Sequence, residues 1–155
     1  MNKNFYITTP IYYPSAKPHM GHAYSSIISD FFARFKRIQG CNVLFLTGTD
    51  EHGQKIQRAA EKEGMDPLPF CDKISKTFRD LSKTLNLSNN DFIRTTEKRH
   101  FKSVQNLWNI LEKKNMHPKV FCDEISKTFF DLSKTLNLSN DDFIRTTEER
   151  HKKSV

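Results

Sequence analysis

Thr-Pro-Ile-Tyr-Tyr-Pro-Ser-Ala-Lys-Pro-His-Met-Gly-His, residues 9–22, is the stretch that decides the fold of this chain. It follows residues 5–9, a short aromatic and β-branched run typical of a strand, and it precedes residues 23–36, where apolar residues recur at helical spacing. The first backbone N–H groups of a helix have no partner within the helix, and that end carries partial positive charge. A strand, a tight loop and a helix start therefore predict a site that faces an anion such as a phosphate.

Two histidines flank a glycine at the end of this loop. His19 and His22 are three residues apart, so their side chains fall on one side of the predicted helix, where either ring can donate a hydrogen bond to a phosphate oxygen. Gly21 has no Cβ atom and lets a nucleotide approach the backbone. Two other interpretations stay open: the rings cap and pack the helix start, or they are two ligands of a metal ion. A third ligand at a matching local spacing is missing, which disfavours a zinc site.

A helix and a second strand follow the loop. Apolar spacing predicts a helix over about 22–39 that ends at Gly40, and residues 41–47 form a short continuous apolar run typical of a buried parallel strand. Strand, helix and strand in this order are half of an α/β nucleotide-binding sheet, in which ligands lie at the carboxyl ends of the strands. The helical stripe consists of Ala23, Ile27, Ile28, Phe31, Phe32 and Phe35.

Composition limits the class of protein. The chain has 155 residues, about one domain, with 36% hydrophobic and 28% charged residues, which suits a soluble protein. Its net charge of +7 fits an anionic partner, but the lysines are spread along helical faces and fit a solvated surface better. Cys41, Cys71 and Cys122 lie far apart, so we expect reduced, packed thiols. Neither a signal peptide nor a membrane-spanning run is recognisable, and we expect a cytoplasmic protein.

Two motifs resemble a known family. The loop His19-Met20-Gly21-His22 after a first strand is similar to the HIGH signature of class I aminoacyl-tRNA synthetases. Residues 9–14 around it and the stretch Phe-Leu-Thr-Gly-Thr-Asp-Glu-His-Gly at 45–53 resemble the methionyl-tRNA synthetases of that class. The resemblance covers roughly the first 115 residues, the first part of the family's catalytic domain. It implies an α/β fold with an incomplete, partial Rossmann-like (HUP-type) parallel sheet and flanking helices.

The resemblance implies a two-step reaction. In the family, the methionine carboxylate attacks the α-phosphate of ATP to form methionyl-adenylate and pyrophosphate, and the methionyl group is then transferred to tRNA(Met). His19 and His22 would be catalytic and, with Gly21, would bind ATP, which enters with Mg²⁺. We expect no zinc or other metal site in this chain. The HIGH region would comprise Tyr12, Tyr13, Pro14, Ser15, Ala16, Lys17, Pro18, His19, Met20, Gly21 and His22.

Four further residues would hold methionine by the same resemblance. Ile11 and Tyr13 offer an apolar wall and an aromatic ring, which suit a thioether. The Asp50 carboxylate would pair with the ammonium group of the amino acid, and His52 would shape the pocket. The residues alone leave alternatives: Tyr13 and His52 can pack against neighbours, and Asp50 can cap a helix that begins near Glu51.

Helical patterns and one more strand follow. Residues 54–63 and 66–85 predict helices, residues 91–95 a strand, and residues 97–115 a helix. Lys73-Ile74-Ser75-Lys76-Thr77 resembles the family's second signature, Lys-Met-Ser-Lys-Ser, but it lies inside an amphipathic helix, so we expect an ordinary helical turn there. The residues expected inside are Phe70, Ile74, Phe78, Leu81 and Leu85 in the helix of residues 66–85, and Val104, Leu107, Trp108 and Leu111 in the last helix.

The chain then repeats itself, because residues 116–155 nearly duplicate residues 65–104. We interpret residues 1–115 as the N-terminal half of a class I synthetase catalytic domain, and residues 116–155 as a poorly placed copy that begins a second helix, strand and helix. The apolar stripe of the copy has no designated partner, which predicts marginal stability or self-association. From Phe70–His100 to Phe121–His151 the paired differences are Lys73/Glu124, Arg79/Phe130, Asn90/Asp141 and Lys98/Glu149.

Two functions are compatible with these residues. The first is an ATP-dependent methionine–tRNA ligase in truncated, catalytically incomplete form, because the family's second half-sheet, its lysine-rich signature loop, its zinc knuckle and its anticodon-binding domain have no counterpart here. The alternative is a non-catalytic fragment that at most binds ATP or methionine weakly.

Overall fold

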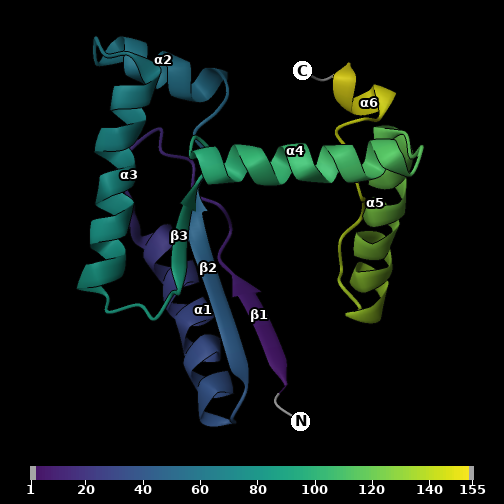
Figure 1. Cartoon of the computed structure of the whole chain (residues 1–155), viewed down its shortest axis with the longest axis horizontal. Coiled ribbons are helices and arrows are strands. Elements are labelled where there is room, and N and C mark those ends of the chain that lie inside the picture. The colour runs from purple at the N-terminus through teal and green to yellow at the C-terminus, as the bar shows by residue number, and fades with distance from the viewer. Residues whose placement is uncertain (1–2, 154–155) are drawn as a thin grey trace. The chain divides into compact units, whose positions relative to one another are not determined.

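The computed structural model describes residues 3–153 and divides the chain into two compact units, residues 1–102 and 103–155 (Figure 1). The elements, in order, are β1 (Asn4–Thr8), α1 (Met20–Ile38), β2 (Asn42–Thr49), α2 (Gln54–Lys62), α3 (Pro67–Thr84), β3 (Asp91–Arg94), α4 (Lys98–Lys113), α5 (Pro118–Thr135) and α6 (Glu149–Lys152). Within residues 3–153, no helix is long and apolar enough to span a membrane.

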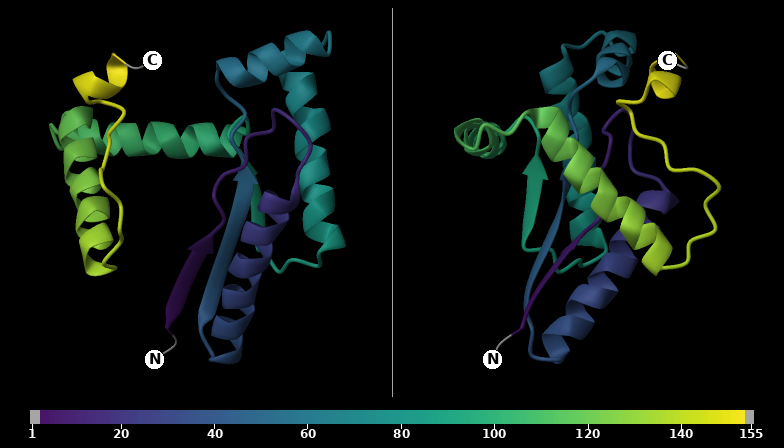
Figure 2. Two further views of the ribbon diagram at one scale, coloured as in Figure 1. Left: turned by 180° about the vertical axis from the view of Figure 1, so that it is seen from behind. Right: turned by 90° about the vertical axis from the view of Figure 1, so that its right-hand side faces the viewer.

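The first unit is built on a parallel sheet of three strands in the order β1-β2-β3 (Figure 2). Asn4 of β1 pairs with Asn42 of β2, and Leu46 of β2 pairs with Asp91 of β3. Helix α1 connects β1 to β2, while α2 and α3 connect β2 to β3. The predicted α/β class and the three predicted strands are therefore confirmed, and the carboxyl ends of all strands lie at one edge of the sheet.

The helix after the loop buries a different face from the predicted one. The residues of α1 that are buried are small or polar, and the large apolar residues of the predicted stripe are exposed, with Phe31 63% exposed. Small residues allow the helix to lie close to the sheet, so this face is selected over the bulky one. Of the stripe, only Ala23 is buried. The buried residues are Ala23, Ser26, Ser29, Asp30 and Ala33, whereas Ile27, Ile28, Phe31, Phe32 and Phe35 are exposed.

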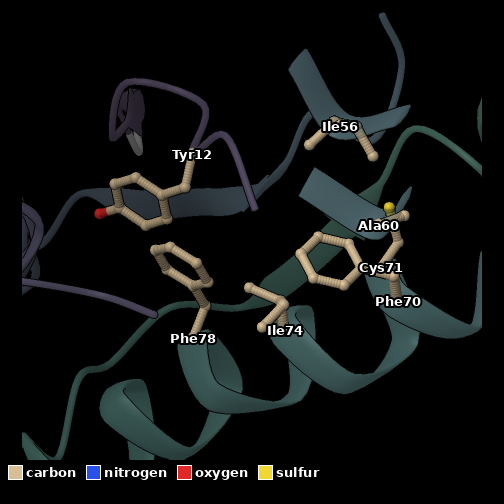
Figure 3. Close-up of a cluster of buried hydrophobic side chains, with 7 residues drawn as sticks. All are labelled: Tyr12, Ile56, Ala60, Phe70, Cys71, Ile74 and Phe78. Carbon is tan, nitrogen blue, oxygen red and sulfur yellow. The ribbon is translucent and has the colours of Figure 1, made fainter. Parts of the chain in front are cut away.

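The main core of the first unit joins the loop to α2 and α3 (Figure 3). Phe70, Ile74 and Phe78 of α3 are buried as predicted, whereas Leu81 and Leu85 are half-buried. This cluster therefore packs α2 and α3 against the loop that contains Tyr12. Its members are Tyr12, Ile56, Ala60, Phe70, Cys71, Ile74 and Phe78.

One glycine is required by the closeness of two strands. A Cβ atom on Gly48, in β2, would lie 2.0 Å from the carbonyl oxygen of Ile93 in β3 and 2.8 Å from its Cγ2 atom. Both distances are shorter than van der Waals contact, and the backbone oxygen is fixed by the sheet. Position 48 therefore admits only glycine while β3 stays paired.

The second unit contains the rest of α4, α5 and α6. Of the four residues of α4 expected inside, Leu111 is buried, but Val104, Leu107 and Trp108 are about half exposed, so that prediction is wrong for these three. None of the residues of α5 is buried, and Cys122 is exposed rather than packed. Residues 142–145, the counterpart of β3, form no strand in the structure, which differs from the expected helix, strand and helix. Among the described residues of the second unit, 103–153, there is no other strand with which residues 142–145 could pair.

Candidate functional site

The two histidines of the loop cap α1 reciprocally. His19 is the N-cap residue, and its Nδ1 atom accepts a hydrogen bond from the backbone N–H of Gly21 at 3.1 Å. His22 returns the interaction, because its Nδ1 atom accepts from the backbone N–H of His19 at 3.1 Å. A capping box commonly uses Ser or Thr with Glu, and imidazole nitrogens take both roles here. The capping that the sequence left as an alternative is thus present.

This cap fixes the protonation pattern of both rings. A nitrogen that accepts an N–H bond carries no proton, so each neutral imidazole holds its proton on Nε2. Burial and the nearby His19 lower the pKa of His22, which favours the neutral form. Two Nε2–H donors therefore lie at the positive end of α1. A Cβ atom on Gly21 would meet Cε1 of His19 at 2.9 Å, so the glycine gives room to the histidine ring itself.

Tyr12 connects the histidines to the sheet and the core. Its backbone forms a parallel bridge with Thr49, and its N–H donates to the carbonyl of Gly48 at 3.0 Å. Its ring packs edge-on against His22 and stacks on Phe78, with centroids 5.1 and 5.2 Å apart. The loop is therefore fixed without a ligand. The sequence placed Tyr12 in the HIGH region but did not assign it this connecting role.

The residues proposed to bind methionine lie in this loop, at Ile11 and Tyr13, and directly after β2, at Asp50 and His52. The N–H of Asp50 donates to the carbonyl of Tyr12 at 2.8 Å, which brings the backbone of Asp50 next to the residue between Ile11 and Tyr13. The hydroxyl of Tyr13 donates to the carbonyl of His52 at 2.8 Å. Ile11 is 51% exposed and Tyr13 38% exposed, so both side chains remain accessible to a ligand.

Asp50 and His52 meet at a threonine. The hydroxyl of Thr95 lies 2.9 Å from Nδ1 of His52 and 3.5 Å from Oδ1 of Asp50. Asp50 does not cap α2, whose N-cap is Gly53, although it accepts a long 3.4 Å hydrogen bond from the N–H of His52. The helix-cap alternative for Asp50 is therefore wrong.

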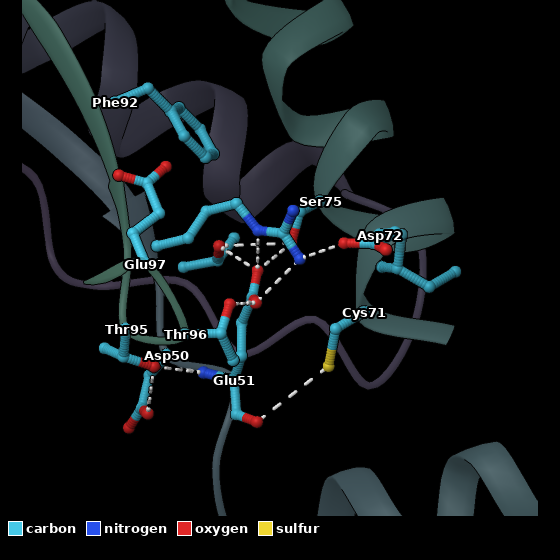
Figure 4. A network of polar contacts seen from close by, with 12 residues as sticks. Asp50, Glu51, Cys71, Asp72, Ser75, Phe92, Thr95, Thr96 and Glu97 are labelled. Carbon is cyan, nitrogen blue, oxygen red and sulfur yellow. Dashed lines mark hydrogen bonds and ion pairs between the residues drawn. The ribbon is translucent and has the colours of Figure 1, made fainter. Parts of the chain in front are cut away.

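A buried carboxylate next to Asp50 was missed from the sequence (Figure 4). Glu51 has a fully buried side chain that accepts from Nε and Nη2 of Arg94 at 2.7 and 2.8 Å. Burial alone would raise its pKa, but the hydrogen bonds from Arg94, Ser75, Thr96 and Thr49 outweigh burial and lower the pKa of Glu51. This ion pair joins the carboxyl ends of β2 and β3 beneath the site. The available signal was weak: Glu51 lies four residues after one predicted strand, and Arg94 lies near the end of the next.

The segment that resembles the second signature is a helical turn of α3, as predicted. Ser75 donates to Oε1 of Glu51, and Ile74 lies in the core. Lys73 pairs on the surface with Glu63 at 3.2 Å. Its two buried residues anchor it to the fold, which a mobile catalytic loop would not allow.

A basic groove of about 920 Å³ opens between the loop and the two helices α2 and α3. Its lining includes none of His19, His22 and Asp50. One carboxylate, that of Glu63, stands against five cationic side chains, so the groove favours anions. Within residues 3–153, no group of three or more His, Cys, Asp or Glu side chains is arranged to hold a metal ion. The cationic residues are Lys17, Lys55, Arg58, Lys62 and Lys73.

Comparison with known proteins gives consistent matches. The model of the family described as tRNA synthetases class I (M) matches residues 5–116 and, separately, residues 111–155. The mitochondrial methionine--tRNA ligase of Takifugu rubripes is 55% identical over 115 residues, which are 74% of this chain and 20% of that protein. The methionine--tRNA ligase of Rickettsia conorii is 56% identical over 108 residues, 70% of this chain and 21% of that protein.

A solved structure matches as well. The crystal structure of Mycobacterium tuberculosis methionyl-tRNA synthetase bound by methionyl-adenylate has a TM-score of 0.69 and 43% sequence identity, and the match covers 72% of this chain and 22% of that one. The chain therefore spans about a fifth of the length of the relatives that it matches. The separate match of residues 111–155 follows from the internal copy.

Proposed function

The chain belongs to the family of class I tRNA synthetases (M), and we propose that its first unit binds ATP and methionine as part of a methionine–tRNA ligase. The whole reaction would join methionine to ATP as methionyl-adenylate and then transfer the methionyl group to tRNA(Met). One observation carries the proposal: two imidazoles with their protons held on Nε2 stand at the positive end of α1.

His19 and His22 would bind the phosphates of ATP, which enters as its Mg²⁺ complex. Negative charge grows on the α-phosphate oxygens as the methionine carboxylate attacks, and fixed donors stabilise that charge without reorganising during the reaction. Because both Nδ1 atoms already accept backbone N–H bonds, neither ring has to change tautomer when the nucleotide arrives. The lowered pKa of His22 keeps this ring a neutral donor near neutral pH.

Methionine would lie above the loop, between Ile11, Tyr13 and Asp50. The Asp50 carboxylate offers a partner for the ammonium group, and the exposed Ile11 side chain and Tyr13 ring offer apolar contact for the thioether. His52 would act indirectly, because its carbonyl holds the Tyr13 hydroxyl and its ring contacts Thr95.

Calorimetric titration tests both binding sites. We expect His19→Ala and His22→Ala to weaken MgATP binding, and Asp50→Asn to weaken methionine binding about tenfold or more, since one charged hydrogen bond is lost. His117→Ala is the matched control, because His117 also caps a helix through Nδ1 but does so in the second unit, at α5. Equal binding by the parent chain, His19→Ala and His22→Ala would reject the assignment.

A second candidate is a non-catalytic fragment that binds ATP or methionine without activating methionine. It is favoured by the helical conformation of residues 73–77, because the segment that resembles the lysine-rich signature is held in α3 and is not a mobile loop. Exchange of labelled pyrophosphate into ATP, dependent on methionine, separates the two candidates. Exchange above background that is lost in His22→Ala supports the ligase, and its absence despite measurable binding supports the fragment.

Three further assignments are part of the proposal. The five cations of the basic groove would attract the phosphates of tRNA(Met) as the partner of the complete reaction. The exposed apolar face of α5 would let chains self-associate, which sedimentation at increasing concentration would reveal. The protein would act in the cytoplasm, and cell fractionation would test this.

A further inference from the structure

We propose that the surface which holds residues 67–97 in the first unit accepts residues 118–148 in their place, so that two segments of one chain compete for one site. We call this site the acceptor surface and define it by Tyr12, Asp30, Arg37, Phe45 and Glu51. Besides the pairing of β3 with β2, three groups of contacts hold residues 67–97 on it, and each of these three has its counterpart in residues 118–148.

The first group is the buried carboxylate. Glu51 accepts hydrogen bonds from Arg94, Ser75 and Thr96, and the Thr96 hydroxyl lies 2.5 Å from it. All three donors recur unchanged at the equivalent positions of the copy. A second guanidinium is therefore available to a carboxylate that can pair with only one bidentate partner. The counterparts are Arg145, Ser126 and Thr147.

The second group holds the turn after α3 against α1 and β2. Ser88 donates to Oδ1 of Asp30 from its backbone N–H at 2.7 Å and from its hydroxyl. Oδ1 of Asn90 accepts from the backbone N–H of Phe45 at 2.8 Å and from Arg37 at 3.0 Å. In the copy, Ser88 becomes Ser139 and Asn90 becomes Asp141. A carboxylate keeps the acceptor role and adds attraction to the Arg37 guanidinium.

The third group is the apolar face of α3, which packs in the core with Tyr12 (Figure 3). The ring of Phe78 stacks on Tyr12, and Cys71 is buried. The same residue types recur on α5, none of whose residues is buried. The paired residues are Phe70 with Phe121, Cys71 with Cys122, Ile74 with Ile125, and Phe78 with Phe129.

The helix and the following turn of the copy already have the conformation that docking requires, whereas residues 142–145 would form their strand only on pairing with β2. Helices α3 and α5 both span 18 residues and both begin with proline. The turn after each contains an asparagine with positive φ, 49° at Asn86 and 50° at Asn137. The ion pair of Arg94 with Asp72 at 2.6 Å is repeated by Arg145 with Asp123 at 2.5 Å. Little ordering cost therefore remains for residues 118–135.

The two helices differ at four positions, and all four substitutions are compatible with exchange. Leu68 and Pro69 are exposed, so Lys119 and Val120 at their places would cost little. Lys73 pairs with Glu63 at the surface, and both side chains are about half exposed, so Glu124 at that place would cost little. Cζ of Arg79 lies 5.0 Å from the centroid of the Phe92 ring. In the copy the counterparts are Phe130 and Phe143, whose rings pack edge-on with centroids 5.7 Å apart. An aromatic pair thus replaces a cation–π pair at the same position.

Stoichiometry favours exchange within one chain over exchange between chains. Each chain has one acceptor surface and two segments that fit it, so a swapped dimer leaves the same number of segments undocked as two monomers do. The dimer gains no contact and loses translational freedom. When residues 118–148 dock, residues 63–117 connect α2 to them as a long loop, whose closure costs more than that of residues 63–66 and therefore favours residues 67–97 in the parent chain.

Alkylation of the two equivalent cysteines reports which segment is docked. In the structure Cys71 is buried, and burial beside Glu51 raises the pKa of its thiol to about 11, whereas Cys122 is exposed. Trypsin releases Cys71 in the peptide of residues 63–73 and Cys122 in that of residues 120–127, which differ in mass. Iodoacetamide labelling followed by mass spectrometry therefore measures both sites in one sample.

The test weakens one segment at a time. Arg94→Ala should shift docking to residues 118–148, so that Cys71 is alkylated faster and Cys122 more slowly than in the parent chain. If nine of ten molecules have exchanged segments, the alkylation rate of Cys122 should fall about tenfold. Arg145→Ala is the matched control and should leave Cys71 protected. The double variant, Arg94→Ala with Arg145→Ala, should unfold at lower urea than Arg94→Ala alone.

The opposite results overturn the proposal. If Cys122 is alkylated equally fast in the parent chain and in Arg94→Ala, the second segment does not dock. If Arg94→Ala is as unstable as the double variant, or does not fold at all, residues 118–148 cannot replace residues 67–97.

Discussion

Replacing Glu51 by glutamine should remove a large part of the stability of the first unit. The side chain of Glu51 is fully buried and that of Arg94 is 17% exposed, so the charge of neither group is well screened. Losing one partner of such a pair costs about 3–5 kcal/mol, and we expect the lower end of that range because Arg94 keeps its ion pair with Asp72. Glutamine also has one acceptor oxygen where the carboxylate has two, and it turns an N–H group toward other donors. This loss is a large share of the total stability of a small domain.

Urea unfolding followed by circular dichroism measures this loss, provided that the slope of the transition is unchanged. The matched control is Asp72→Asn, because Asp72 pairs with the same Arg94 at 2.6 Å but is 58% exposed. We expect this variant to lose less than about 1 kcal/mol. Exchange of segments cannot rescue Glu51→Gln, since both segments need the same carboxylate. A loss for Glu51→Gln no larger than that for Asp72→Asn would refute the reasoning.

The pH dependence of the same variant gives an independent check. The folded chain lowers the pKa of Glu51 below its ordinary value of 4.5, so folding stability contributed by this group is complete above pH 4.5 and is lost as the pH falls toward the lower, folded pKa. Glu51→Gln lacks this contribution at every pH. The difference in unfolding free energy between parent and variant should therefore shrink on acidification, and a constant difference from pH 7 to pH 3 would contradict it.

Three further predictions follow from the loop and the core. Because folding lowers the pKa of His22, this residue takes up a proton more readily in the unfolded chain than in the folded chain, and the free energy of unfolding should fall as the pH drops below 6.5, by at most about 1.4 kcal/mol per pH unit. His22→Gln keeps an acceptor for the His19 N–H and should flatten that part of the curve of unfolding free energy against pH. Gly21→Ala should displace the His19 ring, whose Cε1 atom would be 2.9 Å from the new Cβ, and weaken MgATP binding in calorimetry without unfolding the chain. Phe78→Ala should cost about 3–5 kcal/mol in urea unfolding, whereas the exposed Phe31→Ala should change stability by less than about 0.5 kcal/mol; equal losses would contradict the burial of these side chains.

Local patterns predicted the elements of the first unit well. The apolar run that became β2, the helix that starts at Pro67 and the parallel arrangement all follow from short-range signals, namely continuous apolar residues, proline in a first turn and a crossover helix. The signals that placed His19 and His22 at a helix start were also short-range. Their reciprocal cap was left open because imidazole can cap, coordinate or donate, and only the hydrogen-bond partners decide which.

Contacts between distant residues were less predictable. The bulky stripe of α1 has the stronger helical pattern, yet the opposite face, with Ala33 and Ser26, is buried, since close approach to the sheet depends on residue size as well as hydrophobicity. Glu51 and Arg94 are 43 residues apart, and neither lies in a motif that marks a buried pair. The half-exposed Trp108 shows that an amphipathic helix predicts an apolar face without specifying whether that face is covered.

The close contact between β2 and β3 at Gly48 has a consequence for mutational scanning. At most sites a substitution grows more harmful as the side chain grows, but here the first carbon atom already collides with a backbone oxygen, so alanine should be tolerated no better than leucine. A library covering every position should show a flat, uniformly depleted profile at residue 48.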